Sequence, residues 1–195
     1  MKFLITGGGT GGHIYPALAI ANEIKDRHSD ANILYVGTAH GLESELVPKE
    51  GYNFKTIRVK GFSRKLSKET FSTIKELFLG LKDSRKIINE FKPDVVIGTG
   101  GYVCGPVVYT ASRKGIPTLI HEQNAFPGIT NKILSRYVDK VAVSFEEANK
   151  YFKYPEKIIM TGNPVRKSLV NVDTKNAQTI NVGAEIKLQC RKQLS

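Results

Sequence analysis

The chain has 195 residues, of which 41% are hydrophobic, and its formal net charge is +11. It holds neither an apolar run of the roughly 18 residues that cross a membrane nor a signal peptide, so we expect a cytoplasmic protein with a buried core. The charge predicts an anionic partner: nucleic acid, an acidic membrane surface or a phosphorylated substrate. Its two cysteines, Cys104 and Cys190, have neither a disulfide nor a metal spacing, and no metal is expected.

The first predicted strand, 2–6, leads into a glycine-rich stretch, 7–12, at the start of a helix predicted over 12–27. Glycine lets the backbone approach a ligand closely, and the first N–H groups of a helix are unpaired at the positive end of its dipole. The stretch therefore predicts an anion site, with a diphosphate as its natural ligand. A tight turn without a ligand is the alternative, but five glycines in six positions exceed what a structural turn needs.

Two nucleotide-binding motifs can be tested against this stretch. Gly7, Gly9 and Gly12 match G-x-G-x-x-G, yet no acidic residue follows the second predicted strand, 33–36, where a dinucleotide fold needs one. A phosphate-binding P-loop needs Lys and then Ser or Thr after its last glycine, and this chain has His13 there. Both absences count against a nucleotide-dependent oxidoreductase.

Short β-branched runs and helical patterns alternate along the rest of the chain. The remaining strands are predicted at 54–59, 94–97, 117–120, 140–143 and 158–160, and the remaining helices at 41–49, 67–91, 104–114 and 129–136. This alternation predicts an α/β fold, a doubly wound and mostly parallel sheet with helices on both faces. Ligands of such sheets bind beyond the carboxyl ends of the strands.

Two further clusters follow predicted strands. A second glycine-rich stretch, 98–106, comes after the strand 94–97, and four polar residues, 121–124, come after the strand 117–120. Each of these residues taken alone could be an ordinary loop or capping residue. Because parallel strands end at one edge, the clusters together predict a site there.

The long predicted helix 67–91 has an unusually broad apolar surface, an arc of about 200°, where one core-facing stripe covers roughly 100° or more. Phe71 and Phe78 lie at one margin of this arc, beside Lys75 and Lys82. An apolar patch with a basic rim predicts attachment to an anionic lipid surface. The alternative is a helix packed on two sides with a solvated lysine face.

Several motifs occur in a fixed order along the chain. They are GGGTGGHIYPALA at 7–19, GT at 37–38, LVP at 46–48, KPDVV at 92–96, GGYVCGP at 100–106, HEQN at 121–124 and GNPVR at 162–166. Together they resemble the MurG family, the bacterial enzymes that add N-acetylglucosamine to lipid I in peptidoglycan synthesis. The resemblance runs from residue 1 to about residue 170.

The resemblance implies a Rossmann-like N-terminal domain of a GT-B glycosyltransferase that needs no metal or other cofactor. Its members transfer the sugar from UDP-N-acetylglucosamine to the 4-hydroxyl of the muramyl sugar on undecaprenyl diphosphate, with inversion. The implied location is peripheral, at the cytoplasmic face of the cell membrane, on an anionic inner-membrane surface. Nucleic acid is not expected as a partner, because the basic residues are scattered among acids.

Site residues are carried over by motif. Contacts to the donor UDP-N-acetylglucosamine are implied for Thr10, Gly11, Gly12, Asn124 and Arg166. Contacts to the acceptor and its diphosphate are implied for Gly9, His13, Gly100, Gly101 and Tyr102. Inversion needs a base for the acceptor proton, and His13 and Glu122 are the candidates. We favour His13, because the pKa of an imidazole suits proton transfer near neutral pH.

The resemblance divides the chain into an acceptor-binding domain at 1–163 and, at 164–195, a linker with a truncated or aberrant start of the donor-binding domain. The family's second Rossmann-like domain is missing, so we expect the last 25 residues to be irregular and the chain alone to be inactive. The alternative function is a non-catalytic basic module that binds a membrane or a diphosphate.

Overall fold

The computed structural model describes residues 1–61 and 68–165, except for the side chains of 68–72 and 74. Arg166 and the final residues, for which an irregular conformation is expected, lie outside the described part. Residues Met1–Pro164 form one compact unit.

The described residues form a single parallel sheet of seven strands in the order β3-β2-β1-β4-β5-β6-β7. The strands are β1 (Lys2–Thr6), β2 (Asn32–Gly37), β3 (Asn53–Thr56), β4 (Val95–Gly98), β5 (Thr118–Glu122), β6 (Lys140–Val143) and β7 (Ile158–Met160). Strand β1 lies between β2 and β4, so the winding direction reverses there. This order confirms the predicted doubly wound, Rossmann-like sheet.

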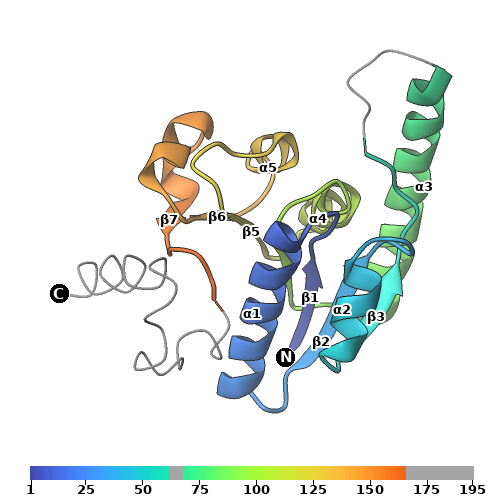
Figure 1. Cartoon of the computed structure of the whole chain (residues 1–195), viewed down its shortest axis with the longest axis horizontal. Coiled ribbons are helices and arrows are strands. Elements are labelled where there is room, and N and C mark those ends of the chain that lie inside the picture. The colour runs from blue at the N-terminus through green and yellow to red at the C-terminus, as the bar shows by residue number, and fades with distance from the viewer. Residues whose placement is uncertain (62–67, 166–195) are drawn as a thin grey trace, which may run out of the picture. The chain divides into compact units, whose positions relative to one another are not determined.

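Helices cover both faces of the sheet (Figure 1). They are α1 (Gly11–Arg27), α2 (Glu43–Lys49), α3 (Lys68–Phe91), α4 (Cys104–Arg113) and α5 (Ile129–Leu134), with short 3-10 helices η1 (Glu146–Tyr151) and η2 (Pro155–Lys157). Helices α1 and α2 lie on one face, and α3, α4 and α5 on the other. In the described part of the chain, no helix has the length and apolar character to cross a membrane.

Successive side chains of a strand point to opposite faces of the sheet, and a hydrophobic core lies on each face. Leu4 joins Val96 and Ile120 in the core under α3, α4 and α5, whereas its neighbour Ile5 joins Ile14 of α1 in the core on the opposite face. Strands buried on both faces read as continuous apolar runs, which is why β1 and β4 could be predicted from the sequence.

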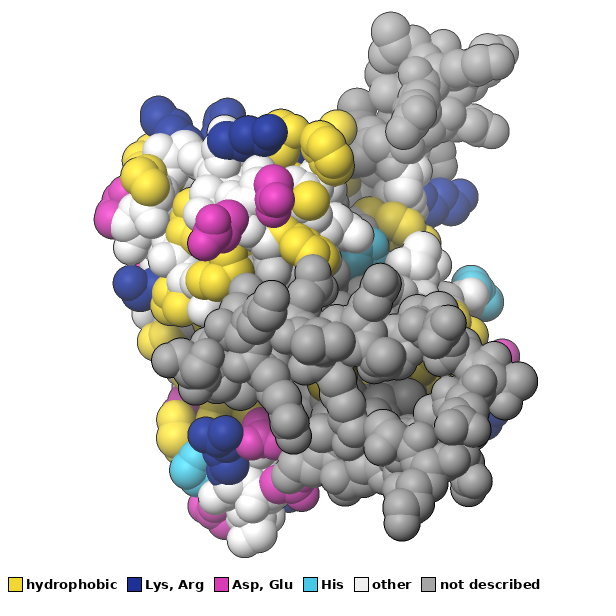
Figure 2. Space-filling view, turned by 60° about the vertical axis from the view of Figure 1, so that its left-hand side comes forward, with side chains coloured by type: hydrophobic (Ala, Val, Ile, Leu, Met, Phe, Trp, Pro, Cys, Tyr) yellow, Lys and Arg dark blue, Asp and Glu magenta, His cyan; other side chains and the backbone are white. Residues whose placement is uncertain are grey.

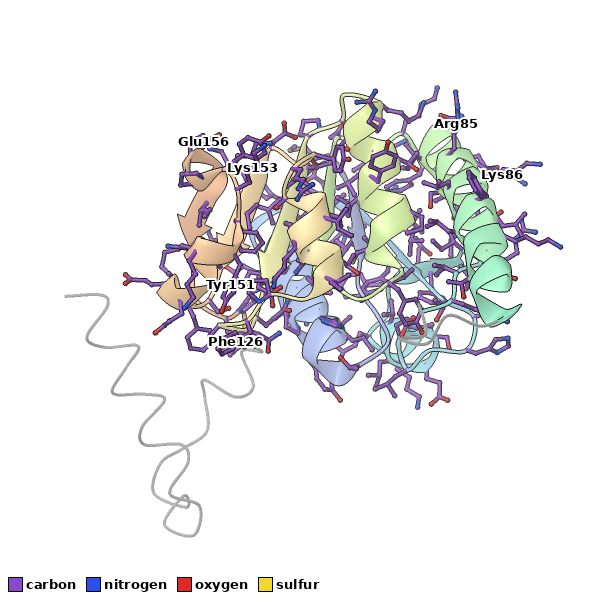
Figure 3. All side chains as sticks on the ribbon, turned by 90° about the horizontal axis from the view of Figure 1, so that it is seen from above. Arg85, Lys86, Phe126, Tyr151, Lys153 and Glu156 are labelled. Carbon is purple, nitrogen blue, oxygen red and sulfur yellow. The ribbon has the colours of Figure 1, made fainter. Side chains whose placement is uncertain are left out.

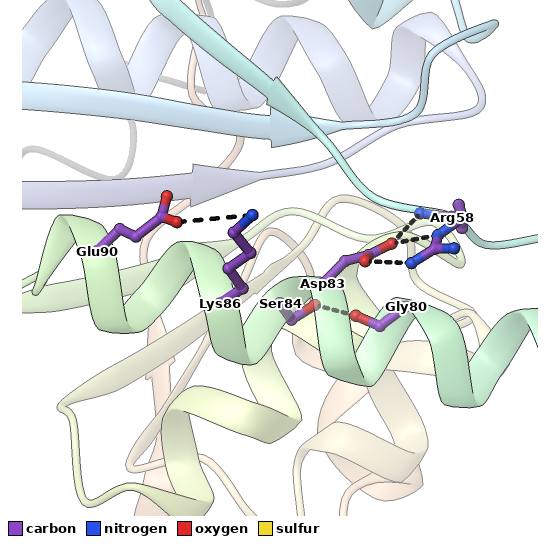
Figure 4. A network of polar contacts seen from close by, with 6 residues as sticks. All are labelled: Arg58, Gly80, Asp83, Ser84, Lys86 and Glu90. Atoms are coloured by element: carbon purple, nitrogen blue, oxygen red, sulfur yellow. Dashed lines mark hydrogen bonds and ion pairs between the residues drawn. The ribbon is translucent and has the colours of Figure 1, made fainter.

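Several element boundaries differ from the prediction by one to three residues, and three of these differences are informative. Strand β3 ends at Thr56 and not at 59, because the backbone N–H and the guanidinium of Arg58 both bind the carboxylate of Asp83 on α3 (Figure 4). Helix α5 ends at Leu134 and not at 136, because the N–H groups of Arg136 and Tyr137 bond carbonyls three residues back, in tighter turns. Strand β5 continues to Glu122, so His121 and Glu122 are buried strand residues and not part of a loop.

Candidate functional site

The first glycine stretch forms the turn between β1 and α1. Gly9 has a φ of +85°, a conformation that favours glycine, and Thr10 is extended with a φ of −146°. The carbonyl of Thr10 then accepts the N–H groups of His13 and Ile14, at 3.1 and 3.2 Å, and closes the first helical turn. The helix therefore begins with the two glycines that follow Thr10.

The second glycine stretch, after β4, lies directly against the first. The N–H of Gly8 donates to the carbonyl of Gly100 at 3.3 Å, and the N–H of Thr99 donates to the carbonyl of Thr6 at 2.9 Å. A Cβ on Gly101 would overlap the carbonyl oxygen of Gly8. The two stretches thus meet at the carboxyl edge of the sheet.

The backbone N–H groups in the first stretch have different surroundings. The N–H of Gly9 donates to Oε2 of Glu43 at 3.2 Å, so a protein carboxylate already occupies this donor. The N–H groups of Gly11 and Gly12 have no acceptor among the described residues. These two groups, at the positive end of α1, are therefore the donors available to an anion.

The ring of His13 lies against the second glycine stretch. A Cβ on Gly100 would be 2.9 Å from Nε2 of His13, and Nδ1 of His13 lies 3.1 Å from the carbonyl oxygen of Gly8 and 3.3 Å from the hydroxyl of Thr10. A carbonyl oxygen only accepts, so Nδ1 of the neutral ring carries the proton and donates it to Gly8. The lone pair is then on Nε2, where it can accept a proton.

Tyr102 completes this cluster. Its ring lies 3.5 Å from where a Cβ on Gly9 would be, and its side chain is partly exposed. The structure thus brings together eight of the predicted residues, Gly9, Thr10, Gly11, Gly12, His13, Gly100, Gly101 and Tyr102.

Glu122, at the end of β5, is a buried residue with several internal hydrogen bonds. Its Oε1 accepts the N–H and the side-chain amide of Asn124 at 3.1 and 3.0 Å, and its Oε2 accepts the N–H of Gly128 and the side-chain amide of Asn131 at 3.2 and 2.9 Å. The carboxylate is buried, and four donors occupy it. Asn124 is exposed, and its side-chain oxygen is the group left to contact a ligand.

His121 and Gln123 connect β5 to its surroundings. Nε2 of His121 donates to the carbonyl of Gly162 at 3.0 Å, and its Nδ1 accepts the side-chain amide of Gln123 at 3.0 Å. The same amide donates to the carbonyl of Thr99 at 2.9 Å, which ties β5 to the loop after β4. Burial lowers the pKa of His121, although its bond to Gly162 and the charge of Glu122 act in the opposite direction.

Cys104 begins α4 behind the second glycine stretch. Its Sγ lies 3.1 Å from the carbonyl of Thr6 and 3.0 Å from that of Gly100, and burial raises the pKa of the thiol to about 12. A thiol that stays protonated is a packing group and not a nucleophile. In the described part of the chain, no group of three or more His, Cys, Asp or Glu residues could hold a metal ion.

The predicted membrane residues lie on α3. Phe78 is 68% exposed and therefore not a core residue, and Lys75 is also exposed. Phe71 belongs to the helix, but its side chain lies outside the described part. The coloured part of the face shown in Figure 2 carries hydrophobic side chains beside charges of both signs.

Glu43 and Asn131 were not predicted as site residues. Glu43 is separated from Gly9 by 34 positions, and an acidic residue at the start of a helix is an ordinary feature. The signal that could have found Asn131 is its position in a predicted helix directly after the polar residues of β5.

The glycosyltransferase family 28 N-terminal domain matches residues 3–143 of the chain. A curated relative from Thermoanaerobacter sp. (strain X514) is 64% identical over 183 residues, which are 94% of this chain and 50% of the relative. It is named UDP-N-acetylglucosamine--N-acetylmuramyl-(pentapeptide) pyrophosphoryl-undecaprenol N-acetylglucosamine transferase. The chain thus spans about half the length of the curated relatives it matches.

Two solved structures share the fold. The crystal structure of Acinetobacter baumannii MurG matches with a TM-score of 0.69 and 29% identity, over 85% of this chain and 46% of that one. A UDP-GlcNAc 2-epimerase from Neisseria meningitidis matches with a TM-score of 0.63 over 97% of this chain and 54% of that one. The two sequences are 15% identical, so this match shows only that the folds are similar.

Proposed function

The chain belongs to the glycosyltransferase family 28 N-terminal domain family, and from this premise we propose that it is the acceptor-binding half of a peptidoglycan N-acetylglucosaminyltransferase. The reaction is transfer of N-acetylglucosamine from UDP-N-acetylglucosamine to lipid I, with inversion at the sugar carbon. The observation that carries the proposal is the 64% identity, over 94% of this chain, to a relative named for that reaction.

The carboxyl edge of the sheet supports the substrate assignment. Both substrates contain a diphosphate, and the N–H groups of Gly11 and Gly12 are donors with no acceptor in the described structure. We assign Thr10, Gly11, Gly12, Asn124 and Arg166 to the donor sugar nucleotide. We assign Gly9, His13, Gly100, Gly101 and Tyr102 to the acceptor, with Gly9 contributing close backbone approach because its N–H is bound to Glu43.

His13 is the proposed general base. Transfer with inversion requires a base that removes the proton of the acceptor hydroxyl as UDP leaves. In His13 the bond from Nδ1 to the carbonyl of Gly8 fixes the ring and leaves the Nε2 lone pair as the proton acceptor. Glu122, the other candidate, has both carboxylate oxygens occupied by internal donors, so we assign it to support of the loop that carries Asn124.

The proposed location is the cytoplasmic face of the cell membrane, where the protein would attach peripherally. Phe78 and Lys75 are exposed on one helix, α3, and Phe71 belongs to the same helix. Apolar area and basic charge together hold a peripheral protein on anionic lipid. Such a position would bring the carboxyl edge to a lipid-linked acceptor.

The test is a transfer assay with a lipid I analogue and labelled UDP-N-acetylglucosamine. We expect the 195-residue chain alone to be inactive, because the closed, water-excluding cleft of such an enzyme comes from both halves. Supplying the C-terminal half of the Thermoanaerobacter relative should restore transfer. Failure to restore it, with binding to lipid vesicles retained, would favour the alternative of a non-catalytic basic module. Transfer by the chain alone at the rate of a full-length relative would contradict the two-half proposal.

A further inference from the structure

A buried carboxylate lies against the first glycine stretch. Glu43 is the first residue of α2, and its side chain is fully buried. Its Oε2 accepts the N–H of Gly9 at 3.2 Å, and its Oε1 accepts the N–H and the hydroxyl of Thr38 at 3.0 and 2.7 Å. Burying a carboxylate is costly unless donors of this kind surround it, so these three bonds are what stabilises Glu43 in this position.

Glycines leave the space that the carboxylate fills. A Cβ on Gly8 would lie 2.5 Å from Oε1 of Glu43, and a Cβ on Gly37 would lie 2.5 Å from its Cγ. A Cβ on Gly41 would overlap both carboxylate oxygens. These glycines belong to the β1–α1 turn, the end of β2 and the segment before α2. The backbone of separate segments is thus shaped around this one side chain.

The bond to Gly9 acts at the point where the chain turns into α1. Gly9 has a positive φ, and the helix begins only two residues later. The preceding residue, Gly8, donates its N–H to the carbonyl of Gly100 at 3.3 Å. Glu43 and Gly100 therefore hold two successive residues of the turn, and the N–H groups of Gly11 and Gly12 follow at the start of α1.

We propose that Glu43 is a positioning residue that holds Gly8 and Gly9 in the conformation that presents the N–H groups of Gly11 and Gly12 to an anionic ligand. Glu43 acts through the backbone of the turn and does not contact the ligand. The identity of the ligand as a diphosphate rests on the proposed function. The hydrogen bond between Gly9 and Glu43 does not depend on it.

The first test is hydrogen exchange of the Gly9 amide in the 195-residue chain and in Glu43→Gln, followed by NMR. Glutamine can still accept from Thr38, but it then places an N–H₂ donor against the N–H of Gly9. We expect exchange at Gly9 to be about tenfold faster, since a bond to a charged acceptor is lost, with strand amides unchanged. Glu45→Gln, an exposed position on the same helix, is the control and should leave Gly9 unchanged. Equal exchange at Gly9 in wild type and Glu43→Gln would overturn the proposal.

The second test is a titration with inorganic pyrophosphate and with UDP-N-acetylglucosamine, followed by the Gly11 and Gly12 amide resonances. We expect Glu43→Gln to need about tenfold more of either probe for saturation, at an unchanged circular dichroism spectrum. Equal affinity in the two proteins would overturn the positioning role. If wild type binds neither probe, the proposed function fails. Hydrogen exchange of the Gly9 amide still tests whether Glu43 holds the turn.

If the Glu43→Gln protein does not fold, the hydrogen bond can still be measured in the wild-type protein. A scalar coupling across the hydrogen bond, between the Gly9 nitrogen and the Glu43 carboxyl carbon, is expected. Absence of this coupling would overturn the proposal.

Discussion

The backbone of Gly101 passes directly against the backbone of Gly8. Gly101 has a φ of +82°, and a Cβ on it would overlap the carbonyl oxygen of Gly8 and lie 3.1 Å from the carbonyl carbon. Neither backbone can move freely, because Gly8 also donates to Gly100. The packing of the two glycine stretches therefore depends on the absence of a side chain at position 101.

We predict that Gly101→Ala lowers the free energy of unfolding by about 3 kcal/mol or more, because the positive φ and the overlap with Gly8 both have to be relieved. Urea unfolding measures the change. Gly105→Ala is the control: among the described atoms none lies within 4 Å of its Cβ, and the position is helical. There the free energy of unfolding should stay the same or rise by up to about 1 kcal/mol. Equal effects at the two positions would contradict the packing argument.

His13→Ala and Glu122→Gln should fail in different ways. We expect His13→Ala to lower transfer by the complemented chain by roughly 10²- to 10⁴-fold, the usual contribution of a general base, with little change in unfolding. Glu122→Gln should instead lower the free energy of unfolding by about 2 to 3 kcal/mol. The reason is that the glutamine N–H₂ group would face N–H groups that now donate hydrogen bonds to the Glu122 carboxylate.

Transfer rates and urea unfolding of both variants separate the two roles. Full activity in His13→Ala would mean that His13 is not the general base. A stable but inactive Glu122→Gln would make Glu122 the candidate for the base.

The stability of the domain should depend on pH through His121. Burial lowers its folded pKa from the ordinary value of 6.5, so below that pH the unfolded chain binds more protons than the folded one. The contribution is fully present above pH 6.5 and is lost as the pH falls toward the folded pKa, with a slope of up to about 1.4 kcal/mol per pH unit. Unfolding in urea between pH 5 and about pH 8 measures it.

The matched controls for this slope are His121→Gln and His40→Gln. The first should lack the His121 component, and the second should keep it, because His40 is exposed. A slope that survives in His121→Gln would assign the pH dependence to another group.

Phe78→Asp should release the protein from anionic vesicles and leave the fold intact. Its side chain is 68% exposed, so a charge there costs little in folding but opposes both the apolar and the electrostatic parts of lipid binding. Sedimentation with phosphatidylglycerol vesicles at low and high salt, with circular dichroism alongside, should show binding about tenfold weaker.

Phe126→Asp is the comparison, because Phe126 is 73% exposed but lies beside Tyr151, at a ring separation of 5.8 Å, far from Arg85 and Lys86 of α3 (Figure 3). It should bind vesicles like wild type. Equal binding by Phe78→Asp and wild type would mean that this surface of α3 does not touch lipid.

The sequence predicted the elements whose signal is local. Strand β1 and the turn into α1 followed from an apolar run and five glycines, and β6 (Lys140–Val143) and β7 (Ile158–Met160) have the predicted bounds. The short 3-10 helices η1 and η2 were not predicted, because six or fewer polar residues carry no periodic signal.

The sequence could not predict contacts between distant segments. Glu122 was considered a possible base from its place in the HEQN motif, and only the structure shows that donors from Asn124, Gly128 and Asn131 occupy its carboxylate. Because β5 continues to Glu122, this residue lies on the same face of the strand as the buried Ile120. Similarly, Arg58 was included in a predicted strand, whereas its bidentate contact with Asp83 ends that strand early.

Strands β1 and β4 are hydrogen-bonded neighbours although the chain completes two other strands and three helices between them. The two glycine stretches at their ends therefore cannot meet until β4 and the start of α4 have been synthesised. A nascent chain that stops before α4 would expose the 7–12 stretch without its partner. Contacts of such long sequence separation form slowly, so the two glycine stretches should come together late in folding.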